Sequence, residues 1–148
     1  MKYLRHTIKT ILISALALII FNWLVNITEG ERFYTPDEVV ASVICAEAVG
    51  ERYVGLYAVS NVVKNRANQY KISPYKVVTQ KNQFYGYTNP NREKLYMQNK
   101  DYCDYLSKNL MKLDDITGGA LYFRRVGEKK QSWHLKRTIK IKNHIFYK

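Results

Sequence analysis

Apolar positions divide the chain into two regions with different patterns. The first holds a run of 18 residues without a charge, from Thr10 to Ile27. As a helix this run spans about 27 Å, close to the roughly 30 Å of a bilayer's hydrocarbon core. Lysine and arginine precede the run, and Glu29 and Glu31 follow it. The positive-inside rule then places the amino terminus in the cytoplasm and the remainder outside. We therefore expect residues 1–30 to form a transmembrane signal anchor and residues 31–148 a separate extracytoplasmic domain.

Two alternatives to the membrane anchor remain open. A cleaved signal peptide has similar basic and apolar segments, but the best small-residue cleavage pattern here, Thr28-Glu29-Gly30, is poor. A buried helix is the other alternative. Both the anchor and the signal peptide carry the domain out of the cytoplasm, which argues against nucleic acid as a partner.

Beyond residue 31 the apolar positions take up helical spacing. Thr35-Pro36-Asp37-Glu38 has the pattern of a capping box with proline in the first turn, and Gly50 is a typical helix stop. The helix predicted over residues 35–49 carries an apolar stripe of Val40, Val43 and Ile44, and the next position on that stripe is Glu47.

Glu47 has two interpretations. A carboxylate at the end of a core-facing stripe costs free energy to bury unless a partner satisfies it. Glu47 is then either a helix-end residue that is solvated or bonded to a turn, or a general acid. In the second case burial raises its pKa above the ordinary value of ~4.3.

The remaining pattern predicts more helices and a small sheet. Helices are expected over residues 54–69, 73–79 and 92–111, the last with a break near Asn99, and residues 83–87 are expected to be extended. Alternating positions predict strands over residues 120–124, 138–142 and 145–147. The expected fold class is α+β, a helical body with a small antiparallel sheet at its carboxyl-terminal end.

Composition adds a strong positive charge. The chain has 24 Lys and Arg against 12 Asp and Glu, which leaves a net charge of +12. Such a surface favours an anionic partner: nucleic acid, membrane lipid or an acidic polymer such as murein. An extracytoplasmic domain favours murein among these three.

The cysteines and histidines indicate no metal chemistry. No Cys/His cluster has the spacing of metal ligands, so we expect neither a metal nor a cofactor. Cys45 and Cys103 could pair in an oxidising compartment, but we expect two separately buried thiols.

Several segments together carry a resemblance to a known family. They are, in chain order, Ile44-Cys45-Ala46-Glu47-Ala48, Gly50-Glu51, Val62-Val63-Lys64-Asn65-Arg66, Gln83-Phe84, Thr117-Gly118-Gly119-Ala120-Leu121-Tyr122-Phe123, Trp133 and Asn143-His144-Ile145-Phe146-Tyr147. In this order and rough spacing they resemble the SleB-type cell wall hydrolases, the spore-cortex-lytic family with its bacterial and phage relatives. The resemblance covers nearly the whole chain after Thr35.

The resemblance implies a lysozyme-like, lytic-transglycosylase-like fold. It also implies cleavage of peptidoglycan between N-acetylmuramic acid and N-acetylglucosamine, with Glu47 as the catalytic acid. Two departures stand out: Arg124-Arg125-Val126 replaces the family's aromatic-Asn-Pro sequence, and Lys142 replaces a glycine. These departures concern the groove rim and substrate preference, and they leave Glu47 untouched.

A second catalytic carboxylate is hard to identify from the sequence. Glycosidases that invert or retain use two, about 5 to 9.5 Å apart. Glu51 lies beyond Gly50 and is expected to support the helix end, and Asp101 and Asp115 are distant alternatives. We therefore expect a lytic transglycosylase, in which Glu47 alone acts as acid and base and the product is a 1,6-anhydro sugar. A muramidase and a non-catalytic murein-binding protein remain alternatives.

The candidate substrate-binding residues are Gln83, Phe84, Tyr85, Tyr122 and His144. An amide suits an acetamido group, and an aromatic ring can stack on a sugar. For the aromatic residues, packing in the core is the competing interpretation, and for His144 it is a structural hydrogen bond. Asn65 and Arg66 are expected to cap and pin the second helix.

Overall fold

The computed structural model describes residues 14–21, 34–48, 50–128 and 134–148. The chain separates into two units, residues 1–33 and 34–148. In the first unit, residues 14–21 are helical. No described helix is both long and apolar enough to cross a bilayer. Most of the predicted span over residues 10–27 lies outside the described residues, so the membrane anchor stays a prediction.

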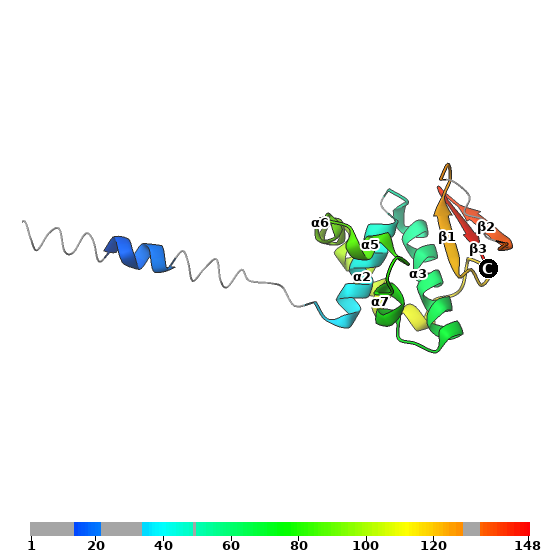
Figure 1. Ribbon diagram of the computed structural model, residues 1–148, viewed down its shortest axis with the longest axis horizontal. Helices are drawn as coiled ribbons and strands as arrows, with labels where there is room; N and C mark the ends of the chain where they lie inside the picture. The colour runs from blue at the N-terminus through cyan, green and yellow to red at the C-terminus, as the bar shows by residue number, and fades with distance from the viewer. Residues whose placement is uncertain (1–13, 22–33, 49, 129–133) are drawn as a thin grey trace, which may run out of the picture. The chain divides into compact units, whose positions relative to one another are not determined.

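The second unit is a helical body with a small sheet, and the predicted fold class is confirmed. Its elements are α2 (Pro36–Glu47), α3 (Arg52–Tyr70), α4 (Pro74–Val78), α5 (Tyr85–Thr88), α6 (Arg92–Gln98), α7 (Lys100–Lys108), the 3₁₀ helix η1 (Leu110–Lys112), β1 (Tyr122–Arg125), β2 (Arg137–Ile141) and β3 (His144–Tyr147). Helix α2 contacts α3, α4, α5, α6 and α7, whereas the sheet packs on α3 (Figure 1). Helix α2 is therefore the central helix of the described body.

Helix α2 begins where the sequence predicts. The Thr35 hydroxyl oxygen accepts from the Glu38 amide at 3.3 Å, and the Glu38 carboxylate accepts from the Thr35 amide at 3.0 Å. The helix ends at Glu47, two residues earlier than expected, and Gly50 follows with a φ of +79°. Glu47 is consequently a terminal helical residue whose side chain is not locked into a continuing helix face.

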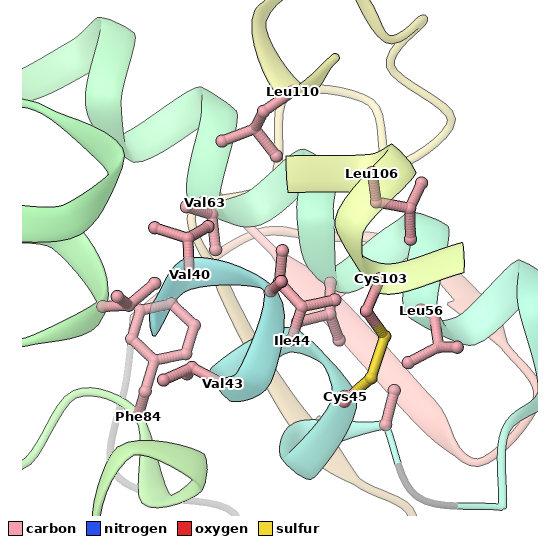
Figure 2. Close-up of a cluster of buried hydrophobic side chains, with 14 of the residues drawn as sticks. Val40, Val43, Ile44, Cys45, Leu56, Val63, Phe84, Cys103, Leu106 and Leu110 are labelled. Atoms are coloured by element: carbon pink, nitrogen blue, oxygen red, sulfur yellow. A yellow bond between two sulfur atoms is a disulfide. The ribbon is translucent and has the colours of Figure 1, made fainter. Parts of the chain in front are cut away.

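The core surrounds α2 more completely than a single apolar stripe predicts. Seven consecutive residues, from Val40 to Ala46, are buried because other helices pack on every side of α2. Figure 2 shows Val40, Val43 and Ile44 within this cluster. Each such side chain stabilises the fold by about 1.5–3 kcal/mol when fully buried.

The prediction of two separate thiols was wrong. Cys45 in α2 and Cys103 in α7 form a disulfide, with their Cα atoms 6.2 Å apart (Figure 2). The two residues are 58 positions apart in the sequence. Only the packing of α7 against α2 brings them together, and their spacing does not reveal it.

The three strands form an antiparallel sheet in the order β1-β3-β2. The central strand β3 is buried along its whole length, and Phe146 pairs with Phe123 of β1. Lys142, in the turn before β3, has a φ of +51°. Glycine adopts this conformation at no steric cost, which accounts for the glycine that the family usually has there.

Two further segment predictions had different outcomes. The break expected near Asn99 is confirmed, because α6 ends at Gln98 and α7 begins at Lys100. The extended conformation expected for residues 83–87 was wrong except at Phe84, since Gln83 lies in a turn and Tyr85–Thr88 form the short helix α5. Phe84 itself is extended and buried.

Candidate active site

Glu47 lies in the wall of a cavity of about 1010 Å³. Burial is the largest influence on its carboxyl and raises its pKa above the ordinary value. The Gly86 amide and the positive charges of Arg125 and Arg66 oppose this shift. The net effect keeps the carboxyl protonated to higher pH than in a free glutamate, as a general acid requires.

Four of the five predicted substrate-binding residues line the same cavity as Glu47. They are Gln83, Tyr85, Tyr122 and His144. The side chains come from the segment around α5, from β1 and from β3, so the cavity lies where the helical body meets the sheet. The sequence thus identified residues that the fold brings together from distant segments.

The fifth, Phe84, is not among the residues that line the cavity. Its side chain is 3% exposed, lies in the same core cluster as Val40 and Val43 (Figure 2), and faces Phe123 with ring centroids 6.2 Å apart. Phe84 therefore fixes the loop that carries its neighbours and does not reach a substrate.

Gly86 holds the Glu47 carboxyl in place. Its amide donates to Glu47 Oε1 at 2.5 Å. A Cβ atom at Gly86 would lie 2.7 Å from the Val43 carbonyl oxygen and 3.1 Å from Glu47 Cγ. The approach of α5 to the end of α2 therefore requires glycine at this position.

Gly86→Ala is expected to lower cleavage activity at least tenfold per folded molecule. The added methyl group pushes α5 away from α2 and displaces the carboxyl, and misplacement by about 1 Å can cost about 10²-fold in rate. Overpacking also destabilises the fold by about 1–3 kcal/mol. Activity and melting temperature should be measured together, with Thr88→Ala at the exposed end of α5 as the control. Wild-type specific activity in Gly86→Ala would contradict this role for the glycine.

Arg66 has a larger role than the predicted pinning of its helix. Its Nε donates to the Leu121 carbonyl at 2.6 Å and its Nη1 to Gln83 Oε1 at 3.1 Å. Its guanidinium lies 5.0 Å from the ring centroids of both Phe84 and Tyr122. Arg66 joins α3 to the two segments that flank the cavity, and it also lines the cavity itself.

Asn65 has a similar bridging role. Its amide donates to the Ala120 carbonyl at 3.1 Å and to the Asp115 carboxylate at 3.3 Å. Asp115 also accepts from the Thr117 amide at 2.8 Å and the Gly119 amide at 2.6 Å. Asp115 thus shapes the turn before β1, and neither it nor Asp101 lines the cavity.

Glu51 supports the sheet and not the helix end. It precedes α3 but makes no side-chain capping bond. Its Oε2 accepts from the Asn143 amide at 3.0 Å, and its Oε1 lies 3.9 Å from Nδ1 of His144. Burial lowers the pKa of His144, against the opposing charge of Glu51. His144 is therefore a neutral ring on the cavity wall near pH 7, and Glu51 holds the turn that precedes it through the Asn143 amide.

Sequence reasoning missed most of the charged residues that line the cavity. They are Lys94 of α6, Arg124 and Arg125 of β1, and Glu128 in the turn after β1. Glu128 Oε2 accepts from the Arg125 amide at 3.0 Å. The replacement of the family's aromatic-Asn-Pro sequence by Arg124-Arg125-Val126 was the available signal. Trp133 lies outside the described residues, and within the described ranges no group of His, Cys, Asp and Glu is arranged to hold a metal ion.

Comparison with solved structures establishes the fold. The catalytic domain of the germination-specific lytic transglycosylase SleB from Bacillus anthracis is 23% identical, with a TM-score of 0.64 over 78% of this chain and 97% of that one. The catalytic domain of the Bacillus cereus SleB protein is also 23% identical, with a TM-score of 0.62 over 80% of this chain and 99% of that one. No curated protein matches the chain.

Comparison with sequence families shows which family the chain belongs to. Residues 50–147 match the family model described as Cell Wall Hydrolase. The matched stretch begins after Glu47, so the placement of the acid rests on the helix, the cavity and the resemblance in residues 44–48. Because the match spans most of residues 34–148, the chain belongs to the cell wall hydrolase family.

Proposed function

We propose that this cell wall hydrolase cleaves the glycan strands of peptidoglycan between N-acetylmuramic acid and N-acetylglucosamine, and that Glu47 is its catalytic acid and base. One observation carries the proposal. Glu47 is a partly buried carboxyl whose pKa is raised by burial, and it lies in a large cavity lined by polar and aromatic side chains. Removal of this carboxyl, considered in the Discussion, is the direct test.

The reaction proceeds without a water molecule. Protonated Glu47 gives its proton to the glycosidic oxygen, and the bond from that oxygen to C1 of the muramic acid breaks. The Glu47 carboxylate then takes the proton of the muramic acid C6 hydroxyl, whose oxygen bonds to C1 to give a 1,6-anhydro sugar. The positive charges of Arg125 and Arg66, which act on Glu47, stabilise the carboxylate that forms between the two steps.

Gln83 and the two tyrosines suit sugar binding. Because Gln83 Oε1 already accepts from Arg66, the Gln83 amide nitrogen remains to donate to an acetamido carbonyl. Tyr85 is 70% exposed on the cavity wall. A ring with so much free surface in a groove suits stacking on a sugar better than core packing.

A muramidase is the second candidate, because Glu128 is another carboxylate on the cavity wall. A hydrolase would use it as base or nucleophile. Against this role, Glu128 already accepts the Arg125 amide and closes the turn after β1. The transglycosylase is therefore the function that the geometry favours.

The products should be glycan fragments lighter by one water than those of a muramidase. Mass spectrometry of a digest made in heavy-oxygen water separates the two reactions, because a hydrolase incorporates the label and a transglycosylase does not. Label in the fragments, together with loss of cleavage in Glu128→Gln, would replace the transglycosylase by a muramidase.

We also propose that the domain acts outside the cytoplasm, tethered by residues 1–30. The charge-free run in the sequence supports the tether, and the disulfide supports an oxidising compartment. The full-length protein is expected to fractionate with membranes, with its domain accessible to protease from the outer side only. Recovery of a soluble form that starts near Glu31 would favour the cleaved signal peptide instead.

A further inference from the structure

The cavity has a surplus of positive charge that cleavage of a neutral sugar backbone does not require. Arg66, Lys94, Arg124 and Arg125 line it, whereas the described carboxylates on its wall are Glu47 and Glu128. Glu47 must be protonated to act as an acid, and His144 is neutral near pH 7 because its pKa is lowered. In the reactive state, Glu128 alone opposes the four cations.

Arg66 is the least expected of these cations, because it is 4% exposed. Both oxygens that it contacts, on Leu121 and Gln83, are neutral, and within the described residues no salt bridge to Arg66 occurs. Burial without a carboxylate partner is costly for a guanidinium, and it lowers the pKa of Arg66. The rings of Phe84 and Tyr122 and the two hydrogen bonds nevertheless fix this group at the cavity wall.

Arg124 is held in a comparable way. Its Nε donates to the Tyr147 hydroxyl at 2.9 Å, and its Nη1 donates to the Glu128 carbonyl at 2.9 Å. These acceptors are also neutral, so neither hydrogen bond pairs the guanidinium of Arg124 with a carboxylate. Arg125 follows at the exposed end of β1, and its charge acts on Glu47 more strongly than that of Arg66. Arg66 and Arg124 therefore place fixed positive charge on the cavity wall, and Arg125 adds a charge that acts on Glu47.

We propose that Arg66, Arg124 and Arg125 form a subsite for a carboxylate carried by the muramic acid, so that the substrate is an anionic glycan strand. The proposal rests on the proposed function. Every muramic acid has a lactyl ether that ends in a carboxyl group. In peptide-free strands this carboxylate is free, and in peptide-bearing strands the carboxylates belong to the stem peptide. A guanidinium suits either one, because its N–H groups donate charge-assisted hydrogen bonds to carboxylate oxygens.

Binding of a substrate carboxylate to these arginines would also assist Glu47 as an acid. The charges of Arg125 and Arg66 lower the pKa of Glu47, and that of Glu128 opposes them. A bound carboxylate balances them, so that Glu47 stays protonated to higher pH in the complex than in the free enzyme. The anionic substituent thereby favours the form of the enzyme that can donate a proton.

The test compares soluble glycan chains whose carboxylates are either free or converted to neutral methylamides. For the full-length wild-type protein we expect kcat/KM to fall at least about tenfold on amidation, which corresponds to about 1.4 kcal/mol of lost binding. Arg125→Gln should lose much of the preference and cleave acid and amide at similar rates, whatever its effect on the overall rate. Arg137→Gln, which removes the same charge from exposed β2 outside the cavity lining, should keep the full preference. Melting temperatures establish that both variants are folded.

To separate the two sources of the carboxylate, acid and amide are compared both for peptide-free and for peptide-bearing chains. Faster cleavage of the acid in peptide-free chains identifies the lactyl carboxylate. Faster cleavage of the acid in peptide-bearing chains alone identifies the stem peptide. Equal cleavage of acid and amide in both kinds of chain would overturn the subsite and leave the proposed function intact. If no chain is cleaved, the proposed function fails, and binding of the same chains to Glu47→Gln by calorimetry decides the subsite: equal affinity for acid and amide overturns it.

Discussion

Glu47→Gln is expected to reduce peptidoglycan cleavage by about 10²- to 10⁴-fold, the usual contribution of a positioned acid or base. The amide keeps the size of the side chain, and its oxygen can still accept from the Gly86 amide. It can neither give a proton to the glycosidic oxygen nor take one from the C6 hydroxyl. The loss should therefore appear in kcat and leave binding of the glycan largely unchanged.

The same substitution should not destabilise the domain near neutral pH. Because the folded-state pKa of Glu47 is raised, the folded chain binds more protons than the unfolded chain between the ordinary value and the raised one. Stability therefore falls as pH rises through that window, and an amide avoids this loss. Activity of the wild type should fall in the same direction, as the acid loses its proton.

The control for Glu47→Gln is Glu93→Gln. Glu93 is exposed in the first turn of α6 and does not line the cavity. Glu51 is unsuitable as a control because it is buried and holds the turn before β3. Cleavage rates and melting temperatures of both variants decide the assignment. A folded Glu47→Gln protein with near wild-type cleavage would refute the catalytic role, and an unfolded one would show that Glu47 serves the fold.

The features that could be predicted from the sequence are local ones. The start of α2 follows from the capping box of Thr35 and Glu38, and the position of Glu47 follows from helical spacing. The break at Asn99 and the strands near the carboxyl terminus follow from periodicity in the same way. In each case the residues that determine the structure are neighbours in the chain.

The features that could not be predicted depend on contacts between distant segments. Residues 85–88 form a helix where they meet the end of α2, and Gly86 makes that approach possible. Arg66 was expected to serve its own helix, yet it bonds Leu121, which lies 55 positions away. The charged wall of the cavity likewise requires β1 to lie beside α3. Periodicity contains no information on which helix or strand will be the neighbour.

The disulfide also depends on contact between distant segments. Its loss is expected to lower the free energy of unfolding by about 4 kcal/mol, the chain-entropy value for a loop of 58 residues. For a domain of this size the melting temperature should fall by roughly 15 °C. The bond ties α7 to α2 at Cys45, two residues before Glu47, so its loss should also weaken the support of the acid.

Thermal unfolding of the wild type with and without reductant measures the effect, and the double variant Cys45→Ala/Cys103→Ala should unfold at the lower temperature in both conditions. If reductant leaves the melting temperature of the wild type unchanged while both thiols become reactive, the disulfide contributes no stability, and packing between α2 and α7 alone holds them together.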